Sequence, residues 1–222
     1  MKPIFQGEAY DMIAQPNGIV FSYCHEVVGD KINVHHKMLS IDSARISDVE
    51  KSIYQLAKFG SNYRSVVSCC DNYVTARALL LQNGKVFLSE QDGAARLFDT
   101  DGTPIWTGTL SYRGKAPNDI VLHQNSVWAC YAESNTLLRF QTANFREELR
   151  IGGNRSPFQR PQSLYVYNDS AIVSNSGSNK LLRLDLNHYT VTDYLEFEEP
   201  VYGYTRSQDY EFVLLQSGIY VL

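Results

Sequence analysis

A short pattern of strands and turns recurs along the chain, and it constrains the fold more than any other feature. Residues 160–193 read RPQSLYVYNDSAIVSNSGSNKLLRLDLNHYTVTD. The polar and apolar alternation of SLYVY is typical of a half-buried strand, and Asn168-Asp169 favours a tight hairpin turn. AIVS, LLRLD and TVTDYLEF then predict three more short strands. A single sheet of four such strands cannot bury both faces alone.

The same pattern occurs at least three times. Ile120–Gln141 and Ala78–Asp99 match the stretch element for element. The third strands end at Asp99, Gln141 and Asp185, which are 42 and 44 residues apart. A constant period near this length predicts a β-propeller. The 222 residues accommodate five units of about 44 residues each. We therefore predict a single all-β domain over residues 1–222, a five-bladed propeller with four-stranded antiparallel blades.

The two ends of the chain predict how the propeller closes. Lys2–Gly7 reads as an isolated strand before the first unit. The last unit supplies only three strands, at Val201–Thr205, Tyr210–Leu215 and Gly218–Leu222. Pairing the N-terminal strand with the last blade would complete that blade, close the ring and remove exposed strand edges.

Residues 43–76 form an irregular insertion in this scheme, because they exceed the repeat length. Ser47-Asp48-Val49-Glu50 has the spacing of a helix-capping box, which indicates a short helix before Gly60. Its apolar stripe would consist of Val49, Ile53 and Leu56. The competing interpretation makes Ile53–Phe59 a fourth strand and Arg64–Cys70 an inserted one. We favour the strands over the helix.

Charge and hydropathy exclude several kinds of partner. The chain has 20 Lys and Arg against 24 Asp and Glu, a net charge of −4, with both signs scattered along the sequence. The sequence has no basic patch of the kind that indicates a nucleic acid as partner. It also has no apolar run long enough to span a bilayer. The N-terminus shows no signal peptide, so we expect a cytoplasmic protein, although a removed leader would leave no trace in this sequence.

The four cysteines indicate structural roles. Cys24 and Cys130 each stand alone in a predicted strand, and Cys69 and Cys70 are adjacent. They show neither the C-x-x-C spacing of a zinc site nor the framework of a disulfide-rich secreted domain. We expect them to be small buried side chains in the sheets.

The segment GGNRSPFQRPQSLYVYNDSAIVSNSGSNKLLRLDLNHYTV resembles an NHL-type repeat. In that pattern a proline precedes the innermost strand, and a motif like SNKLLRLD forms the third. The resemblance covers the third and fourth units best. It implies propeller architecture and says little about activity, because such blades occur in scaffolds, receptors and enzymes.

Two shorter segments resemble metal-binding positions of gluconolactonase and regucalcin-type propellers, namely Gly7-Glu8-Ala9 and Pro117-Asn118-Asp119. The resemblance implies Ca²⁺ or another divalent cation in the central channel, held by Glu8, Asn118 and Asp119. The chain departs from that family, since Glu8 lacks a following proline and Gln162 stands where an acidic ligand is expected. The other interpretation of Asn118-Asp119 is a loop capped by side-chain hydrogen bonds. We therefore expect no cofactor.

No sequence motif of a nucleophilic, nucleotide-binding or zinc-dependent enzyme occurs, so we assign no catalytic residue. His35 and His36 are neighbours in a predicted strand and would point to opposite faces, which prevents both from ligating one ion. The lack of such enzyme motifs in the sequence favours binding over catalysis.

Candidate ligand-binding residues are the aromatic and arginine side chains that we place in the segments joining one unit to the next. They are Tyr63, Arg64, Tyr112, Arg113, Arg155, Arg160, Tyr202 and Arg206. Such residues on loops favour protein interfaces and also suit sugars, although packing between blades uses the same residue types.

We therefore predict a non-catalytic binding or scaffold propeller that recognises a protein or a small ligand on its loop face. One alternative is a lactonase-like, metal-dependent hydrolase. Another is a carbohydrate-binding propeller that stacks sugars on Trp106, Trp128 or tyrosines at the rim. Trp106 lies in a predicted outer strand and Trp128 in a middle strand, so we expect both to be buried.

Overall fold

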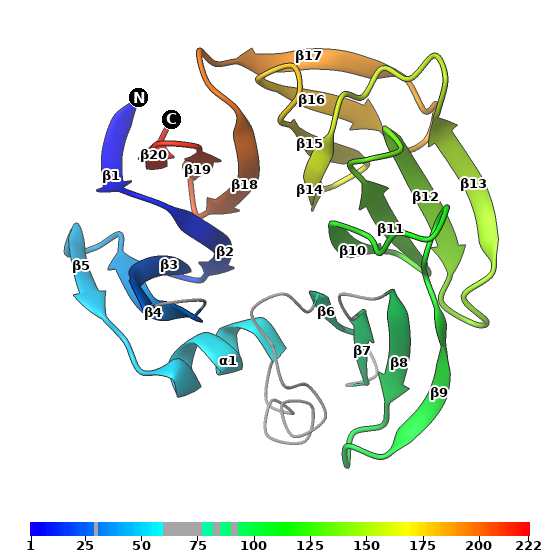
Figure 1. The fold of residues 1–222 in the computed structure, drawn as a ribbon, viewed down its shortest axis with the longest axis horizontal. Coiled ribbons are helices and arrows are strands. Elements are labelled where there is room, and N and C mark those ends of the chain that lie inside the picture. Colours follow the sequence, from blue (N-terminus) through cyan, green and yellow to red (C-terminus); the bar gives the residue numbers. More distant parts are fainter. Residues whose placement is uncertain (29–30, 60–76, 82–84, 90–92) are drawn as a thin grey trace.

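The computed structural model describes residues 1–28, 31–59, 77–81, 85–89 and 93–222. These residues form five four-stranded antiparallel sheets, arranged around a central axis (Figure 1). The predicted all-β propeller is confirmed.

The strands follow one another along the chain from the axis outward. The first sheet contains β2 (Ala9–Gln15), β3 (Gly18–Val28), β4 (Lys31–Ser40) and β5 (Arg45–Asp48). The second contains β6 (Arg77–Leu80), β7 (Val86–Ser89), β8 (Ala94–Phe98) and β9 (Pro104–Thr109). The third contains β10 (Asp119–His123), β11 (Ser126–Tyr131), β12 (Thr136–Gln141) and β13 (Glu147–Gly152). The fourth contains β14 (Pro161–Tyr167), β15 (Ser170–Asn175), β16 (Lys180–Asp185) and β17 (Val191–Glu196).

The fifth sheet combines both ends of the chain. It contains β18 (Val201–Ser207), β19 (Tyr210–Leu215), β20 (Gly218–Val221) and, on its outer edge, β1 (Lys2–Gln6). Strand β1 runs antiparallel to β20, with Lys2 opposite Val221 and Gln6 opposite Gly218. The predicted pairing of the N-terminal strand with the last unit is confirmed, and the two termini lie close together in Figure 1.

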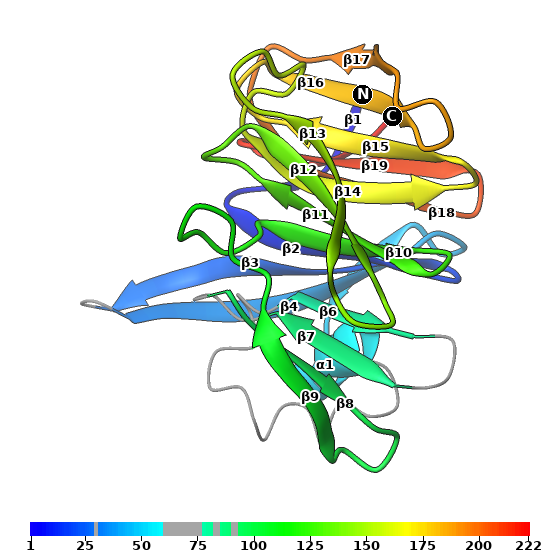
Figure 2. The same ribbon diagram turned by 90° about the vertical axis from the view of Figure 1, so that its right-hand side faces the viewer.

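The innermost strands β2, β6, β10, β14 and β18 surround the axis. Strand β10 contacts both β6 and β14, and β18 contacts both β14 and β2. Figure 2 shows the same molecule from the side. This arrangement places the start of every innermost strand at the same end of the axis, since all five run in the same direction.

Successive sheets bury their faces against each other. In β11, Val127, Ala129 and Tyr131 join a core cluster that includes Phe87 of the second sheet. The alternate residues Trp128 and Cys130 join a separate cluster with the fourth sheet. The period of two along a strand therefore sends neighbouring side chains to opposite neighbouring sheets.

The expected burial of Trp128 and Cys130 is confirmed, since they are 2% and 0% exposed. Trp106 in the outer strand β9 is only partly buried, against Phe87 and Phe145. The side chain of Cys24 and the segment with Cys69 and Cys70 lie outside the described residues.

The insertion contains a helix, and the strand interpretation of Ile53–Phe59 is wrong. Helix α1 (Lys51–Phe59) lies between the first and second sheets and contacts β2, β3, β4 and β6. Its apolar stripe was also mispredicted, because Ile53 and Leu56 are 43% and 46% exposed while Tyr54 is buried. Polar contacts rather than an apolar stripe fix this helix. The proposed strand Arg64–Cys70 lies outside the described residues.

No helix among the described residues is long and apolar enough to cross a membrane.

Two glycines begin middle strands where the neighbouring backbone is too close for any side chain. Gly18 has φ 144° and Gly218 has φ 148°, values that side chains rarely adopt. A Cβ atom at Gly218 would clash with the carbonyl oxygen of Phe5 in β1, and one at Gly18 would clash with that of Leu39 in β4.

We predict that Gly218→Ala destabilises the protein by more than about 2 kcal/mol, because strain at φ adds to a clash with β1. Gly114→Ala is the matched control. Gly114 also has positive φ, at 74°, but an added Cβ meets nothing within 4 Å, so we expect a loss of only about 1 kcal/mol. Urea denaturation measures both variants, and equal losses would contradict the prediction.

Candidate functional site

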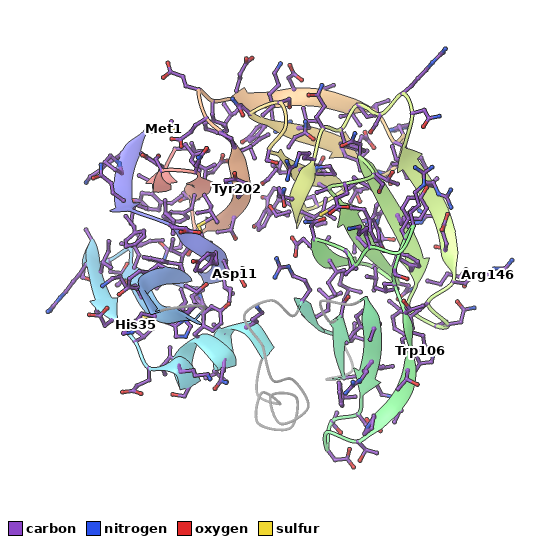
Figure 3. All side chains as sticks on the ribbon, viewed as in Figure 1. Met1, Asp11, His35, Trp106, Arg146 and Tyr202 are labelled. Atoms are coloured by element: carbon purple, nitrogen blue, oxygen red, sulfur yellow. The ribbon has the colours of Figure 1, made fainter. Side chains whose placement is uncertain are left out.

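A cavity of about 790 Å³ lies at the axis, and all five innermost strands contribute to its wall. We call it the central cavity. Its polar and aromatic lining includes Glu8, Asp11, Arg77, Asp119, Gln162, Tyr165, Tyr202, Tyr204 and Gln216. Figure 3 shows the labelled residues Asp11 and Tyr202 on the axial side of their sheets. The volume lies in the range typical of small-molecule pockets, about 300–1,000 Å³.

The central cavity lies beside the face at which the innermost strands begin, which we call the loop face. Segments from different sheets are tied together there. The Gly7 N–H donates to the carbonyl of Ser217 at 3.0 Å, and the Arg160 N–H donates to Asn135 Oδ1 at 2.8 Å.

Asp11 of β2 fixes helix α1 beside the axis. Its Oδ2 accepts hydrogen bonds from the Tyr54 hydroxyl at 2.9 Å and from Lys58 Nζ at 3.1 Å. Its Oδ1 accepts from the Met12 N–H at 2.9 Å. The Lys58 side chain is 6% exposed, so its charge depends on Asp11 as a partner.

Arg77 and Asp119 connect the second, third and fourth sheets. Arg77 Nε donates to the Asn118 carbonyl at 2.6 Å and lies 3.5 Å from Asp119 Oδ1. Asp119 Oδ2 accepts from the Leu164 N–H of β14 at 2.9 Å. Three innermost strands are therefore held together by one carboxylate and one guanidinium group.

The two carboxylates titrate differently. Burial, with a further contribution from Asp11, raises the pKa of Asp119 to about 6, although Arg77 opposes the rise. Burial also disfavours the charged form of Asp11, but Lys58 and Arg77 outweigh it and lower the pKa of Asp11 below its ordinary value. Asp11 is thus ionised where Asp119 still takes up a proton.

His36 packs behind the same helix. Its ring stacks on Tyr54 with 4.3 Å between the ring centroids, and only 5% of the residue is exposed. Burial, together with Lys51, His35 and Lys58, lowers the pKa of His36 to about 4, so it is neutral at neutral pH. His35 is exposed, which confirms that the two histidines point to opposite faces.

Of the residues implied as metal ligands, Glu8 and Asp119 line the same cavity, while Asn118 and Asp119 have other contacts. Glu8 is exposed and lines the central cavity. Asn118 Oδ1 accepts from the Ala132 N–H at 2.8 Å, and its Nδ2 donates to Gln162 Oε1 at 3.2 Å. Together with the Asp119 contact to β14, this is the geometry of capping side chains. In the part of the chain that the structure describes, no group of three or more His, Cys, Asp or Glu could hold a metal ion.

Four of the predicted ligand-binding residues lie in segments that join sheets. Tyr112 follows β9. The guanidinium groups of Arg150 and Arg113 lie over its ring in cation–π contacts, with their central carbons 4.7 and 5.4 Å from the ring centroid. Arg155 and Arg160 are exposed between β13 and β14. These residues therefore lie at the loop face, outside the central cavity.

Tyr202 and Arg206 belong instead to strand β18, not to a joining segment. Tyr202 lies at its beginning and lines the central cavity. Arg206 lies near its other end, where Nε is 3.6 Å from Glu211 Oε1. The structure therefore separates these two residues along the axis. Tyr63 and Arg64 lie outside the described residues.

Three residues of the site were not predicted from the sequence: Asp11 and Arg77, which line the central cavity, and Lys58, which bonds to Asp11. One signal was available for Asp11, a charged residue within the apolar run AYDMIA of a predicted inner strand. Lys58 was hidden by the strand interpretation of α1. Arg77 gave no local signal, because its role depends on the proximity of β6 and β10.

We predict that Asp119→Asn gains stability relative to the unchanged protein as the pH rises. The pKa of Asp119 is about 6 in the folded protein, against an ordinary value of 3.8, so the folded state binds this proton more tightly than the unfolded state does. The resulting contribution to the free energy of unfolding is present below pH 3.8 and is lost as the pH rises to about 6. Asparagine still accepts from the Leu164 N–H but does not ionise. The variant should gain about 1–3 kcal/mol relative to the unchanged protein between roughly pH 4.5 and pH 7.5, measured by urea denaturation. A pH-independent difference would contradict this prediction.

No family model matches the sequence, and no curated protein matches it. Solved structures do match. A streptogramin B lyase is 12% identical with a TM-score of 0.53, over 98% of this chain and 69% of that one. Virginiamycin B lyase from Staphylococcus aureus is 12% identical with a TM-score of 0.53, over 100% and 72%. Glutaminyl cyclase from Myxococcus xanthus is 11% identical with a TM-score of 0.52, over 98% and 93%. At such identities the chain shares the β-propeller fold with these proteins, and the likeness shows the fold alone.

Proposed function

We propose that the protein is a non-catalytic binding propeller that takes a small polar ligand into the central cavity from the loop face. The observation that carries this proposal is the cavity of about 790 Å³, to which all five innermost strands contribute. Its wall combines aromatic rings with a few polar groups from separate strands. That combination is typical of sites that orient small molecules.

The contacts of the charged groups favour binding over catalysis. Asp11 receives three hydrogen bonds from the protein, and Asp119 receives one from the backbone beside its contact with Arg77. A general acid or base must reach a proton of the substrate, and the oxygens of Asp11 are already engaged within the protein. The Asp11 carboxylate therefore serves to hold the cavity wall in place, whereas Asp119, oriented by Leu164 and Arg77, keeps acceptor capacity for a ligand.

We also infer that the five sheets act as five blades of one closed ring. Contacts between β18 and β2 and the pairing of β1 with β20 support closure at the chain ends. Helix α1, which contacts both β2 and β6, supports closure between the first and second sheets.

We predict that Gln216→Trp blocks ligand entry. Gln216 is exposed and lines the central cavity, so an indole at this position would obstruct it. A thermal-shift screen of polar small molecules should yield ligands that raise the melting temperature by a few degrees at about 100 times their Kd. Titration calorimetry should then show at least roughly tenfold weaker binding to Gln216→Trp.

Gln6→Trp is the matched control, because Gln6 is exposed on β1 of the same sheet and does not line the central cavity. Binding to this variant should be unchanged. Ligands that bind Gln216→Trp as tightly as the unchanged protein would contradict the proposed site. A screen that yields no ligand would contradict the proposed function.

A metal-dependent hydrolase is the second candidate, because Glu8 and Asp119 line the same cavity. We predict that millimolar Ca²⁺, Mg²⁺, Mn²⁺ or Zn²⁺ moves the melting temperature by less than about 1 °C relative to EDTA, since Asn118 and Asp119 already bond to backbone groups. A larger shift with one cation, lost in Glu8→Gln, would favour the hydrolase and justify assays with lactones. Glu8 is exposed, so this variant should fold normally.

A further inference from the structure

We propose that the ligand of the central cavity is a neutral carbohydrate of one or two sugar rings, with one ring against Tyr202 and hydroxyl groups bonded to Arg77 and Asp119. This inference rests on the proposed binding function and names the chemical class of the occupant. It follows from the charge balance of the wall, its hydrogen-bonding groups and the position of its aromatic residues.

The charges at the wall nearly cancel. The carboxylates of Asp11 and Asp119 lie beside the cations Lys58 and Arg77, joined by contacts at 3.1 and 3.5 Å. Glu8 adds one further negative charge at the exposed edge. A cavity that concentrates a charged ligand needs a strong field of one sign, and the paired charges of this wall do not provide one. A neutral ligand with many polar groups is therefore favoured over an anion or a cation.

Arg77 retains hydrogen-bonding capacity toward the central cavity. Both of its contacts with the described part of the chain are made by Nε, and 28% of its side chain is exposed. A guanidinium group carries five N–H donors, so its terminal nitrogens can donate to a ligand. The Asp119 carboxylate beside it supplies an acceptor. A donor and an acceptor side by side match two adjacent hydroxyl groups of a sugar.

Tyrosines from the fourth and fifth sheets provide a surface for the apolar face of a sugar ring. Tyr165 and Tyr204 line the central cavity, and their rings pack edge to face with 5.3 Å between the ring centroids. Tyr204 is 6% exposed, whereas Tyr202 is 38% exposed and available to a ligand. Tyrosine combines an apolar ring with a polar tip, which suits the C–H face and hydroxyl rim of a sugar.

Tyr202 thus takes the stacking role that the sequence assigned to tryptophan under the carbohydrate alternative. Trp128 is buried between sheets, and Trp106 lies in the outer strand β9. Neither lines the central cavity.

The test is saturation-transfer NMR followed by titration calorimetry with glucose, galactose, mannose, maltose, cellobiose and lactose. Glucuronate, glucosamine and inorganic phosphate serve as charged comparators. We expect at least one neutral sugar to bind, and Tyr202→Ala to weaken it at least about tenfold through loss of the stacking surface. Tyr210→Ala is the matched control, since Tyr210 is 48% exposed on the same sheet and does not line the cavity.

The outcomes separate this inference from the proposed function. Binding of charged comparators alone, lost in Gln216→Trp, would overturn the carbohydrate inference and leave the binding function intact. Sugar binding that Tyr202→Ala and Tyr210→Ala affect equally would also overturn it. If neither the sugars nor the small-molecule screen gave any ligand, both proposals would fail.

Discussion

A four-stranded sheet with two apolar faces needs both of them covered, and in this protein neighbouring sheets and, between the first and second sheets, helix α1 lie against these faces. Strand β11 shows the constraint most clearly, because Val127 and Ala129 pack toward the second sheet while Trp128 and Cys130 pack toward the fourth. In a sheet whose two faces are both buried, only the strand edges can contact solvent or a ligand. The outer edge meets solvent, and the inner edges together surround the axis where the central cavity lies.

The boundary between the first and second sheets differs from the others, since α1 contacts strands of both sheets there. The contact is polar, with Lys58 and Tyr54 bonded to Asp11. Buried ion pairs contribute little net stability, but removing one partner leaves the other charge uncompensated. Asp11 therefore positions α1 and keeps the buried Lys58 charge compensated.

Strand positions, the propeller fold and the pairing of the N-terminal strand were predictable because they depend on local alternation and on a repeat length. Helix α1 was indicated by the capping-box spacing but not favoured, since its buried face carries Tyr54 and Lys58 in place of an apolar stripe. Part of the candidate site was found from sequence, because Asn118 and Asp119 precede or begin an innermost strand. Arg77 was missed, because its contact with Asp119 joins residues 42 positions apart that the proximity of β6 and β10 brings together.

The fifth sheet has a consequence for the order in which the protein folds. Its outer strand contains Lys2 and pairs with Val221, so the N-terminal strand is made first and finds its partner last. The third and fourth sheets each form from continuous segments and need no such delay. On the ribosome, β1 must therefore wait for its partner until β20 has been synthesised. Contacts of such long sequence separation slow folding, and they leave an open strand edge on the growing chain.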